Sequence, residues 1–90
     1  MESLEELKKL LCELGFNDTV VLDDPSYITA IEGLDGDGRL IYSYEKMVQY
    51  LMETDGCSYE EAVEFIDYNT VRALPYMGDM KPIIIYSLPL

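Results

Sequence analysis

The amino-acid sequence predicts an α+β fold, in which a small, mainly antiparallel sheet of three to four strands packs with three helices. Serines that can cap the start of a helix precede apolar residues at helical spacing, and short runs of β-branched residues are separated by turn residues. Strand-like segments cluster together, and so do two of the helix-like segments, which is typical of α+β rather than alternating folds. We expect one domain over residues 1–90 with the element order α-β-β-β-α-α-β.

The first predicted element is a helix over residues 3–14. Ser3 and Glu6 have the spacing of a capping box, in which each side chain accepts a hydrogen bond from the other residue's backbone amide. Leucines spaced three and four apart form its inner face, and Gly15 is expected to end it in a left-handed conformation. The leucines of this stripe are Leu4, Leu7, Leu11 and Leu14, with Leu10 beside them.

Three short strands are expected next, over residues 19–22, 27–32 and 39–42. Glycines and aspartates between the last two favour a hairpin connection over residues 33–38. The register of this hairpin is not determined by the pattern.

The connection contains Asp35-Gly36-Asp37-Gly38, which is superficially similar to a calcium loop. A calcium loop needs acidic ligands at its first and twelfth positions, and these fall here on Gly33 and Tyr44. A strand rather than a helix is also expected before it. The sequence therefore predicts a turn here and no metal site.

Two helices follow the hairpin. Ser43 is expected to cap a helix over residues 44–54, and Ser58 with Glu61 forms a second capping box. The second helix is expected to end by residue 73, because Pro75 disfavours helical geometry at the residue before it. The side chains expected to face inward are Tyr44, Met47, Val48 and Leu51 in the first helix, and Tyr59, Ala62, Val63 and Ile66 in the second.

A last strand is expected over residues 83–87, between Pro82 and Pro89. It begins with three consecutive isoleucines, so both of its faces are apolar. We therefore expect it at the centre of the sheet, or covered on both faces. If helices cover only one face, the other needs a partner chain, and a homodimer is an alternative to a monomer.

The charge of the chain excludes several classes of function. It has 18 Asp and Glu residues against 6 Lys and Arg, and the net charge of −12 opposes direct binding to nucleic acid or to an anionic membrane. The longest apolar run, residues 83–86, is too short to span a bilayer. These features predict a cytoplasmic protein that favours a basic protein partner.

No catalytic, cofactor or metal site is expected. The chain has no histidine to activate a thiol, so Cys12 and Cys57 are expected to be free and structural. Two cysteines do not supply the four ligands of a zinc site. Phosphate-binding, nucleophile-elbow and dinucleotide motifs are missing from the sequence, and no carboxylate pair is marked out for acid–base catalysis. The sequence thus predicts a protein that is not an enzyme.

The helix that follows Ser58 carries an acidic face. Glu60, Glu64 and Asp67 recur on one side of it, and Glu61 lies beside them. No Lys or Arg in the first three turns of this helix offsets these like charges. Two readings fit the pattern, a merely solvated face and a surface that meets a basic partner.

Tyrosine usage supports the second reading. The chain has eight tyrosines, too many for a small core to bury with every hydroxyl satisfied, so some must be partly exposed. Tyrosine and methionine are enriched at protein interfaces. Tyr50, Tyr68 and Tyr76 are the candidates for partner binding, and ordinary surface packing is the alternative.

Residues 64–78, Glu-Phe-Ile-Asp-Tyr-Asn-Thr-Val-Arg-Ala-Leu-Pro-Tyr-Met-Gly, resemble a group of small acidic proteins of bacteriophages, prophages and bacteria. That group shares a segment of the form E-x-I-x-Y-N-T-x-R-A-L-P-Y-M-G and has no established activity. The resemblance implies a mobile-element setting, where small acidic proteins often inhibit host factors. Structural roles are expected for Asn69 at the Pro75 bend and for Arg72, which suits the end of a helix as a carbonyl cap or carboxylate partner.

The function that these observations predict is a non-enzymatic, acidic interaction protein. It would occupy a basic, nucleic-acid-binding surface of a host protein such as a defence factor, as a phage-type inhibitor does. The alternative is a self-associating accessory or structural domain.

Overall fold

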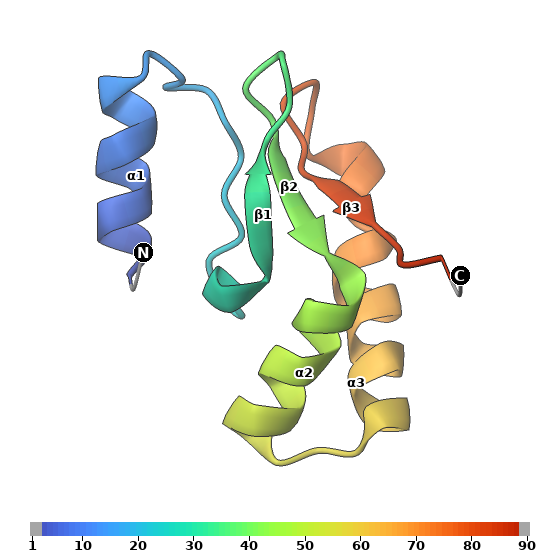
Figure 1. Ribbon diagram of the computed structural model, residues 1–90. Helices are drawn as coiled ribbons and strands as arrows, with labels where there is room; N and C mark the ends of the chain where they lie inside the picture. Colours follow the sequence, from blue (N-terminus) through green and yellow to red (C-terminus); the bar gives the residue numbers. More distant parts are fainter. Residues whose placement is uncertain (1–2, 89–90) are drawn as a thin grey trace.

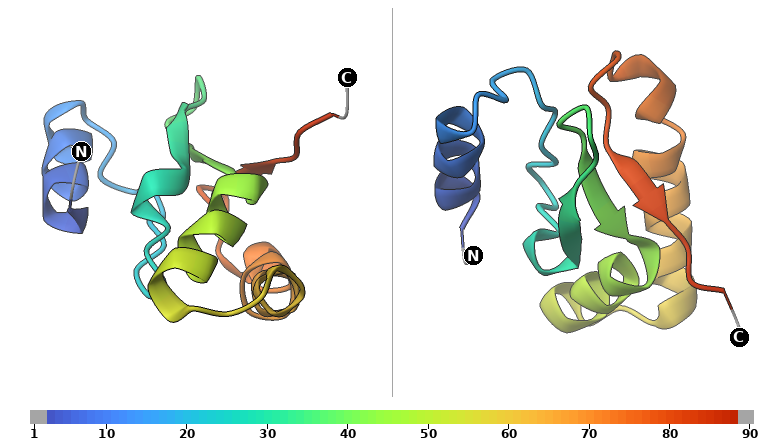
Figure 2. Two further views of the ribbon diagram at one scale, coloured as in Figure 1. Left: turned by 60° about the horizontal axis from the view of Figure 1, so that its bottom comes forward. Right: turned by 45° about the horizontal axis from the view of Figure 1, so that its top comes forward.

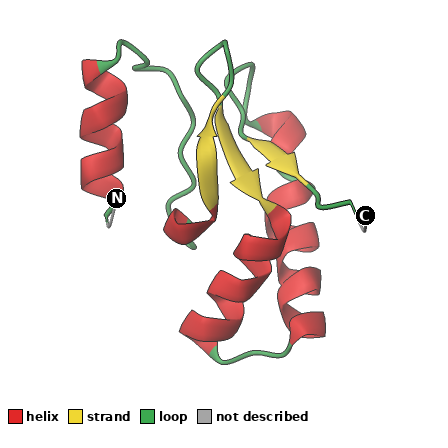
Figure 3. Cartoon of the chain, viewed as in Figure 1, coloured by secondary structure: helices red, strands yellow, loops and turns green. Residues whose placement is uncertain are grey.

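The computed structural model describes residues 3–88 and shows three helices packed with a small mixed sheet, which confirms the α+β class (Figure 1). Helices, strands and loops are distinguished in Figure 3. The elements in chain order are α1 (Leu4–Glu13), the 3-10 turn η1 (Ile28–Ala30), β1 (Ile31–Leu34), β2 (Leu40–Ser43), α2 (Tyr44–Asp55), α3 (Tyr59–Ile66), the π turn η2 (Asp67–Val71), the 3-10 turn η3 (Leu74–Tyr76) and β3 (Ile83–Ile85).

The sheet has the strand order β1-β2-β3. The hairpin pairs β1 and β2 antiparallel, as expected, with a bulge between Ile31 and Gly33. The strands β2 and β3 are parallel, with Ile41 opposite Ile83 and Tyr42 opposite Ile84. The sheet is therefore mixed, because the chain from β2 returns to β3 through two helices, the kind of crossover that parallel neighbours require.

The segment 19–22, expected as a strand, does not pair with the sheet. Its amides find other partners: Val20 N donates to the Met80 carbonyl at 3.3 Å, and Leu22 N donates to the Tyr42 hydroxyl at 3.2 Å. The strand expected over 27–32 also begins later, at Ile31. Tyr27 has a left-handed φ of 49°, and the 3-10 turn η1 follows it, so extended pairing starts only after that turn.

The prediction of a central or doubly covered last strand is wrong, because β3 is an edge strand. The helices α2 and α3 pack against each other on one side of the sheet, and α1 stands beyond β1 (Figure 2). Ile84 packs against the core, whereas Ile83 and Ile85 point to the opposite face together with Ile41. Ile85 is 45% exposed and Ile41 and Ile83 are half-buried, so this face is partly open to solvent.

The core lies between β2, the two C-terminal helices and α1. Leu40 and Tyr42 on β2 are fully buried, and α1 contributes Leu7 and Leu11. Leu14 is exposed, so the apolar stripe of α1 is shorter than its leucine spacing suggests. The other fully or nearly fully buried apolar residues are Leu22, Tyr27, Ala30, Met47, Val48, Leu51, Ala62 and Ile66.

Tyr59, which was also expected to face inward, is outside the core. It is the first residue of α3 and is 60% exposed. Both cysteines are free, as expected, with Cys12 exposed and Cys57 half-buried. Within residues 3–88, no helix is both long and apolar enough to cross a membrane.

Capping residues set the helix boundaries. Ser3, Ser43 and Ser58 each accept a backbone hydrogen bond at the start of a helix, and Gly15 follows α1 with a φ of +88°. The turn over 35–38 is held by Asp35, whose Oδ1 accepts from the amides of Asp37 and Arg39 at 2.9 and 2.8 Å. This confirms the hairpin turn that the sequence predicts.

Two buried tyrosines differ in how their hydroxyls are satisfied. The Tyr42 hydroxyl accepts the hydrogen bond from Leu22 N, whereas the Tyr27 hydroxyl is buried and no atom of the described residues meets hydrogen-bond geometry with it. Burial raises the pKa of Tyr27, and the nearby Thr70 side chain opposes that rise without reaching such geometry. The two tyrosines therefore respond differently to loss of the hydroxyl.

Replacing Tyr42 by Phe leaves the buried amide of Leu22 without a partner, which costs about 1–3 kcal/mol of unfolding free energy. Tyr27→Phe is the matched control and is expected to leave stability unchanged or to raise it, since it removes an unsatisfied hydroxyl. Chemical denaturation of both variants measures the difference. Equal destabilisation of both would contradict this account.

The segment between α1 and η1, called the N-terminal arm here, contacts the hairpin at Gly38. This glycine has a φ of +88°, and a Cβ added to it would overlap the ring of Phe16. The Thr19 hydroxyl donates to the Gly38 carbonyl at 2.6 Å from the same arm. Only glycine fits here, because both the backbone conformation and the contact exclude a side chain.

Gly38→Ala is expected to lower the unfolding free energy by about 2–4 kcal/mol, from the left-handed backbone and the displaced ring together. Gly36→Ala, in the same turn but with open space around it, is the control and is expected to change stability much less. Denaturation curves for the two variants test the assignment. An unaffected Gly38→Ala protein would show that the arm does not pack on the hairpin.

Candidate functional site: an acidic groove beside helix α3

Three of the four predicted acidic residues divide between two sides of one helical segment. Glu60, Glu61 and Glu64 lie on α3, and Asp67 begins the π turn that continues it. Glu61 and Glu64 line a hollow on one side, whereas Asp67 lies on the other, where its Oδ1 accepts a hydrogen bond from the Tyr44 hydroxyl at 2.8 Å. The acids therefore do not form one continuous stripe.

The hollow beside Glu61 and Glu64 is part of a longer groove. Three adjoining depressions share the ring of Phe65, and they run from the end of α2 to the π turn. We call this surface the acidic groove. Its carboxylates are Asp23, Asp24, Asp55, Glu61 and Glu64, and its other lining residues include Leu51, Cys57, Tyr50 and Asn69.

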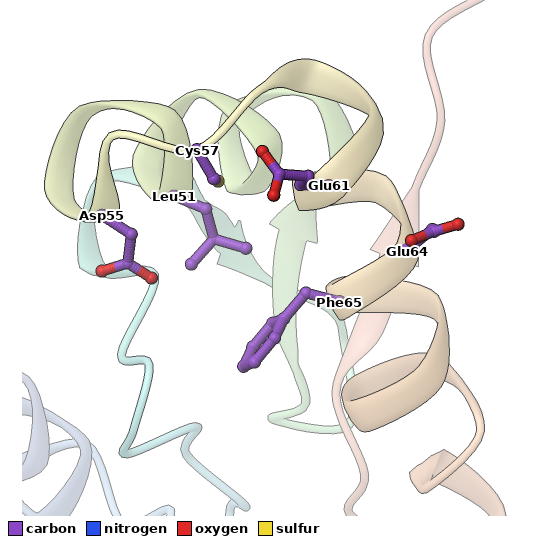
Figure 4. A pocket seen from close by; sticks show the side chains of 6 residues that line it. All are labelled: Leu51, Asp55, Cys57, Glu61, Glu64 and Phe65. Atoms are coloured by element: carbon purple, nitrogen blue, oxygen red, sulfur yellow. The ribbon is translucent and has the colours of Figure 1, made fainter.

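Figure 4 shows the end of the groove between α2 and α3. Phe65 is the accessible apolar side chain of this end and Leu51 is buried beneath it, with Asp55 on the α2 side and Glu61 on the α3 side (Figure 4). The carboxylate of Glu64 points outward at the rim (Figure 4). The Phe65 side chain is 40% exposed, so an aromatic ring is accessible among the carboxylates.

The carboxylates of the groove are unequally neutralised. Lys8 from α1 reaches Asp23 at 3.1 Å, and Glu61 accepts the amide of Ser58 at 3.0 Å in the capping box. Among residues 3–88, the carboxylates of Asp24 and Glu64 have neither an ion pair nor a hydrogen bond, and the carboxylate of Asp55 accepts only the Thr54 hydroxyl, at 3.4 Å. The groove is thus a concave surface with uncompensated negative charge.

Two of the predicted tyrosines lie together outside the groove. Tyr68 is 69% exposed and Tyr76 is 89% exposed, and both line a shallow depression with Arg72 and Ala73. The guanidinium of Arg72 lies over the Tyr68 ring at 5.0 Å, a cation–π contact. This aromatic pair is accessible, as the candidates for partner binding must be.

The third predicted tyrosine, Tyr50, is mostly packed. Its ring lies 5.5 Å from that of Tyr27, and its hydroxyl is 3.1 Å from the Ser26 hydroxyl. It lines the middle of the acidic groove as part of the wall. Tyr50 therefore lines the acidic groove and not the depression that Tyr68 and Tyr76 line.

The residues of the Asn-Thr-x-Arg segment have structural contacts that differ from those expected. Asn69 donates from Nδ2 to the Phe65 carbonyl at 3.0 Å rather than to groups at the Pro75 bend. In an α-helix the Phe65 carbonyl would accept the backbone amide of Asn69. A π turn shifts backbone hydrogen bonds by one residue, and here the Asn69 side chain supplies a donor to that carbonyl instead. Arg72 stacks on Tyr68 instead of pairing with a carboxylate. The helical segment ends before Pro75, as predicted, and Pro75 lies within the 3-10 turn η3.

Several groove residues escaped the sequence analysis. Asp23 and Asp24 have the pattern of a turn, and Asp55 has the pattern of a helix end. Phe65 falls next to the inward positions of α3, which gives no sign that its ring is shared by three depressions. These residues meet only through the packing of α3 against the loop before η1, which no local pattern specifies.

The groove combines carboxylates with an accessible aromatic side chain. No group of three or more Cys, Asp or Glu side chains in residues 3–88 is arranged to hold a metal ion. Phe65, which is partly exposed, suits the alkyl stem of a Lys or Arg side chain, whose charged end would meet the carboxylates. No family model, curated protein or solved structure matches the chain.

The capping box at the groove gives a pH-dependent prediction. Hydrogen bonds with Ser58 hold the pKa of Glu61 below its ordinary value of 4.5. The folded-state pKa is the lower one, so this contribution to stability is present above pH 4.5 and is lost as the pH falls through the lowered pKa. Ser58→Ala is expected to raise the pKa of Glu61 and to cost about 0.5–2 kcal/mol as a lost N-cap.

Titration of the Glu61 carboxyl by NMR, with denaturation at neutral pH, measures both effects. Ser87→Ala is the control, because Ser87 is exposed and caps no helix. An unchanged Glu61 pKa in Ser58→Ala would mean that the capping box does not persist in solution.

Proposed function

We propose that this protein is a non-enzymatic interaction protein that places its acidic groove against a basic surface of another protein. The observation that carries the proposal is the groove itself, in which Asp24 and Asp55 lack cationic partners beside the partly exposed Phe65, and Glu64 lacks one at the rim. A solvated helix face needs neither the concave shape nor the aromatic floor. A site for Lys or Arg side chains uses both.

Charge and aromatic contacts have different roles in such a complex. The net charge of −12 raises the rate of encounter with a basic surface and disfavours acidic partners. Affinity then depends on a few anchors, and Arg and aromatic residues dominate such anchors at protein interfaces. Phe65 in the groove and the exposed Tyr68 and Tyr76 are the aromatic groups in position to serve.

A nucleic-acid-binding surface is the kind of basic surface that the proposal selects. Such surfaces carry Lys and Arg side chains spaced to neutralise a row of phosphates. A row of carboxylates along a groove offers the same side chains a set of anionic partners. The resemblance of residues 64–78 to phage and prophage proteins supports a host protein, such as a defence factor, as the target, and inhibition as the outcome.

Charge reversal within the groove tests the proposal. Asp55→Lys with Glu64→Lys replaces two uncompensated carboxylates, and Glu13→Lys with Asp18→Lys makes the same change in net charge at exposed sites outside the groove. Bacterial lysate is passed over each immobilised protein at low salt, and retained proteins are challenged with duplex DNA. We expect the wild type and the control to retain proteins that duplex DNA displaces. The groove variant is expected to retain an amount of these proteins that is lower by about tenfold or more.

Salt and competition decide the outcome. Retention through the groove must fall as salt rises, because it depends on exposed charges. Equal retention by groove and control variants would show that net charge alone attracts the retained proteins. If duplex DNA does not displace the retained proteins, their bound surface is not a nucleic-acid-binding surface, and that part of the proposal is wrong.

A further inference from the structure

One end of the acidic groove contains two buried hydroxyls without partners. This end is a depression of about 330 Å³ between the loop before η1 and the π turn η2, and we call it the η2 pocket. A volume of this size is at the lower limit of pockets that take small ligands. Among the residues that line it are Asp24, Tyr27, Phe65, Asn69, Thr70 and Met77.

The first of these hydroxyls belongs to Thr70. Two Ser or Thr residues are buried among residues 3–88, and the other one, Ser43, accepts the amide of Lys46 at 3.4 Å. Thr70 is only 6% exposed, yet its hydroxyl meets hydrogen-bond geometry with no atom of those residues. Buried polar groups normally have a hydrogen-bond partner, so this hydroxyl is unusual.

The second hydroxyl, that of Tyr27, lies near the Thr70 side chain and is fully enclosed without a partner. Within the described residues, Tyr27 alone has an enclosed side-chain atom of this kind, so the Thr70 oxygen keeps some contact with the pocket that it lines. A Thr hydroxyl accepts and donates at the same time. A donor in the pocket can therefore bind the Thr70 oxygen and leave its proton free to point towards Tyr27.

The other polar groups of the pocket favour a cation with several donors. Asp23 is already paired with Lys8 at 3.1 Å, whereas the carboxylate of Asp24 has no cationic partner in the part of the chain that the structure describes. Asn69 uses its Nδ2 on the Phe65 carbonyl, which leaves its Oδ1 as an acceptor. A ligand that meets a carboxylate, an amide oxygen and a hydroxyl must carry positive charge and more than one N–H group.

We propose that the η2 pocket binds an alkylguanidinium ion. A guanidinium has five N–H donors in one plane, against three on a compact ammonium. Its plane can lie against Phe65, which is 40% exposed, in the way that Arg72 lies over the Tyr68 ring on the same chain. Met77 lines the pocket as an apolar contact for the alkyl stem.

The source of the guanidinium rests on the proposed function, in which it is an arginine side chain of the basic partner. The carboxylates of Glu61 and Glu64, at the other end of the groove, attract any cation through charge that salt screens. The Thr70 hydroxyl acts only at hydrogen-bond distance. The η2 pocket therefore selects a side chain, whereas the rest of the groove selects a charge.

Titration of the isotopically labelled whole chain with ethylguanidinium chloride, followed by amide NMR, tests the pocket without any partner protein. We expect saturable binding with a dissociation constant of about millimolar, as for a ligand of few non-hydrogen atoms, and the largest shifts at residues 24, 69 and 70. Ethylammonium chloride at the same ionic strength is the matched cation. It is expected to bind about three- to tenfold more weakly, because it lacks the planar set of donors.

Two matched pairs of variants locate the binding. Thr70→Val removes the hydroxyl but keeps the shape of the side chain, and is expected to weaken ethylguanidinium binding by about three- to tenfold. Thr29→Val makes the same change at an exposed residue that does not line the pocket. Asp24→Asn is expected to weaken binding by about tenfold at low salt, with Asp18→Asn, also exposed and outside the pocket, close to wild type.

Several results would contradict the assignment. Shifts that spread over the acidic surface without saturating would show a diffuse ion atmosphere only. Equal affinity of Thr70→Val and wild type would mean that the hydroxyls meet water rather than the cation. Equal affinity for the two cations would mean that the pocket does not recognise a guanidinium.

The pocket and the proposed function can fail separately. Local binding of ethylguanidinium by a protein that retains no basic protein from lysate would keep the pocket, assign it to a free small cation and overturn the proposed function. Retention that charge reversal in the groove abolishes, without local binding of ethylguanidinium, would keep the proposed function and overturn the pocket.

Discussion

The strand β2 is the constraint on which the rest of the structure depends. Leu40 and Tyr42 on its inner face are fully buried, and the strand carries β1 on one side and β3 on the other. The Tyr42 hydroxyl also receives the amide of Leu22, which holds the arm before η1 across the core. Because Ser43 ends β2 and caps α2 in one step, the strand also sets the direction in which the helical pair leaves the sheet.

Patterns that act within one element predicted the fold well. Ser58 with Glu61 forms the capping box, and the hairpin turn is where Asp35 and its glycines place it. Sequence patterns did not predict the features that depend on partners far apart in the chain. The segment 19–22 has β-branched residues, but its amides bond to a loop carbonyl and a tyrosine hydroxyl. The three isoleucines in β3 predicted a covered strand. An edge position with one partly open face accommodates them equally, and the crossover through α2 and α3 decides between the two positions.

The two sides of the helical segment that α3 and η2 form meet different surroundings. The groove is concave and acidic, and it is built from a loop, a helix end and α3, which are segments far apart in the chain. The change of side occurs at the π turn: Phe65, just before it, faces the groove, and Asp67, its first residue, faces Tyr44 on the other side. Only part of the site was therefore predictable: the acids of α3 are visible in the sequence, whereas their division between two surfaces requires the packing around the helix.

Phe65 has a further consequence through its own torsion angles. Its ring forms a wall of all three depressions, and its side chain is only partly buried. A change of rotamer about the Cα–Cβ bond moves the ring out of one depression and into its neighbour while the backbone stays in place. The shape of the groove thus depends in part on one side chain, and a basic side chain entering it, as proposed above, would select among a few discrete ring positions at the cost of a rotamer change rather than of refolding.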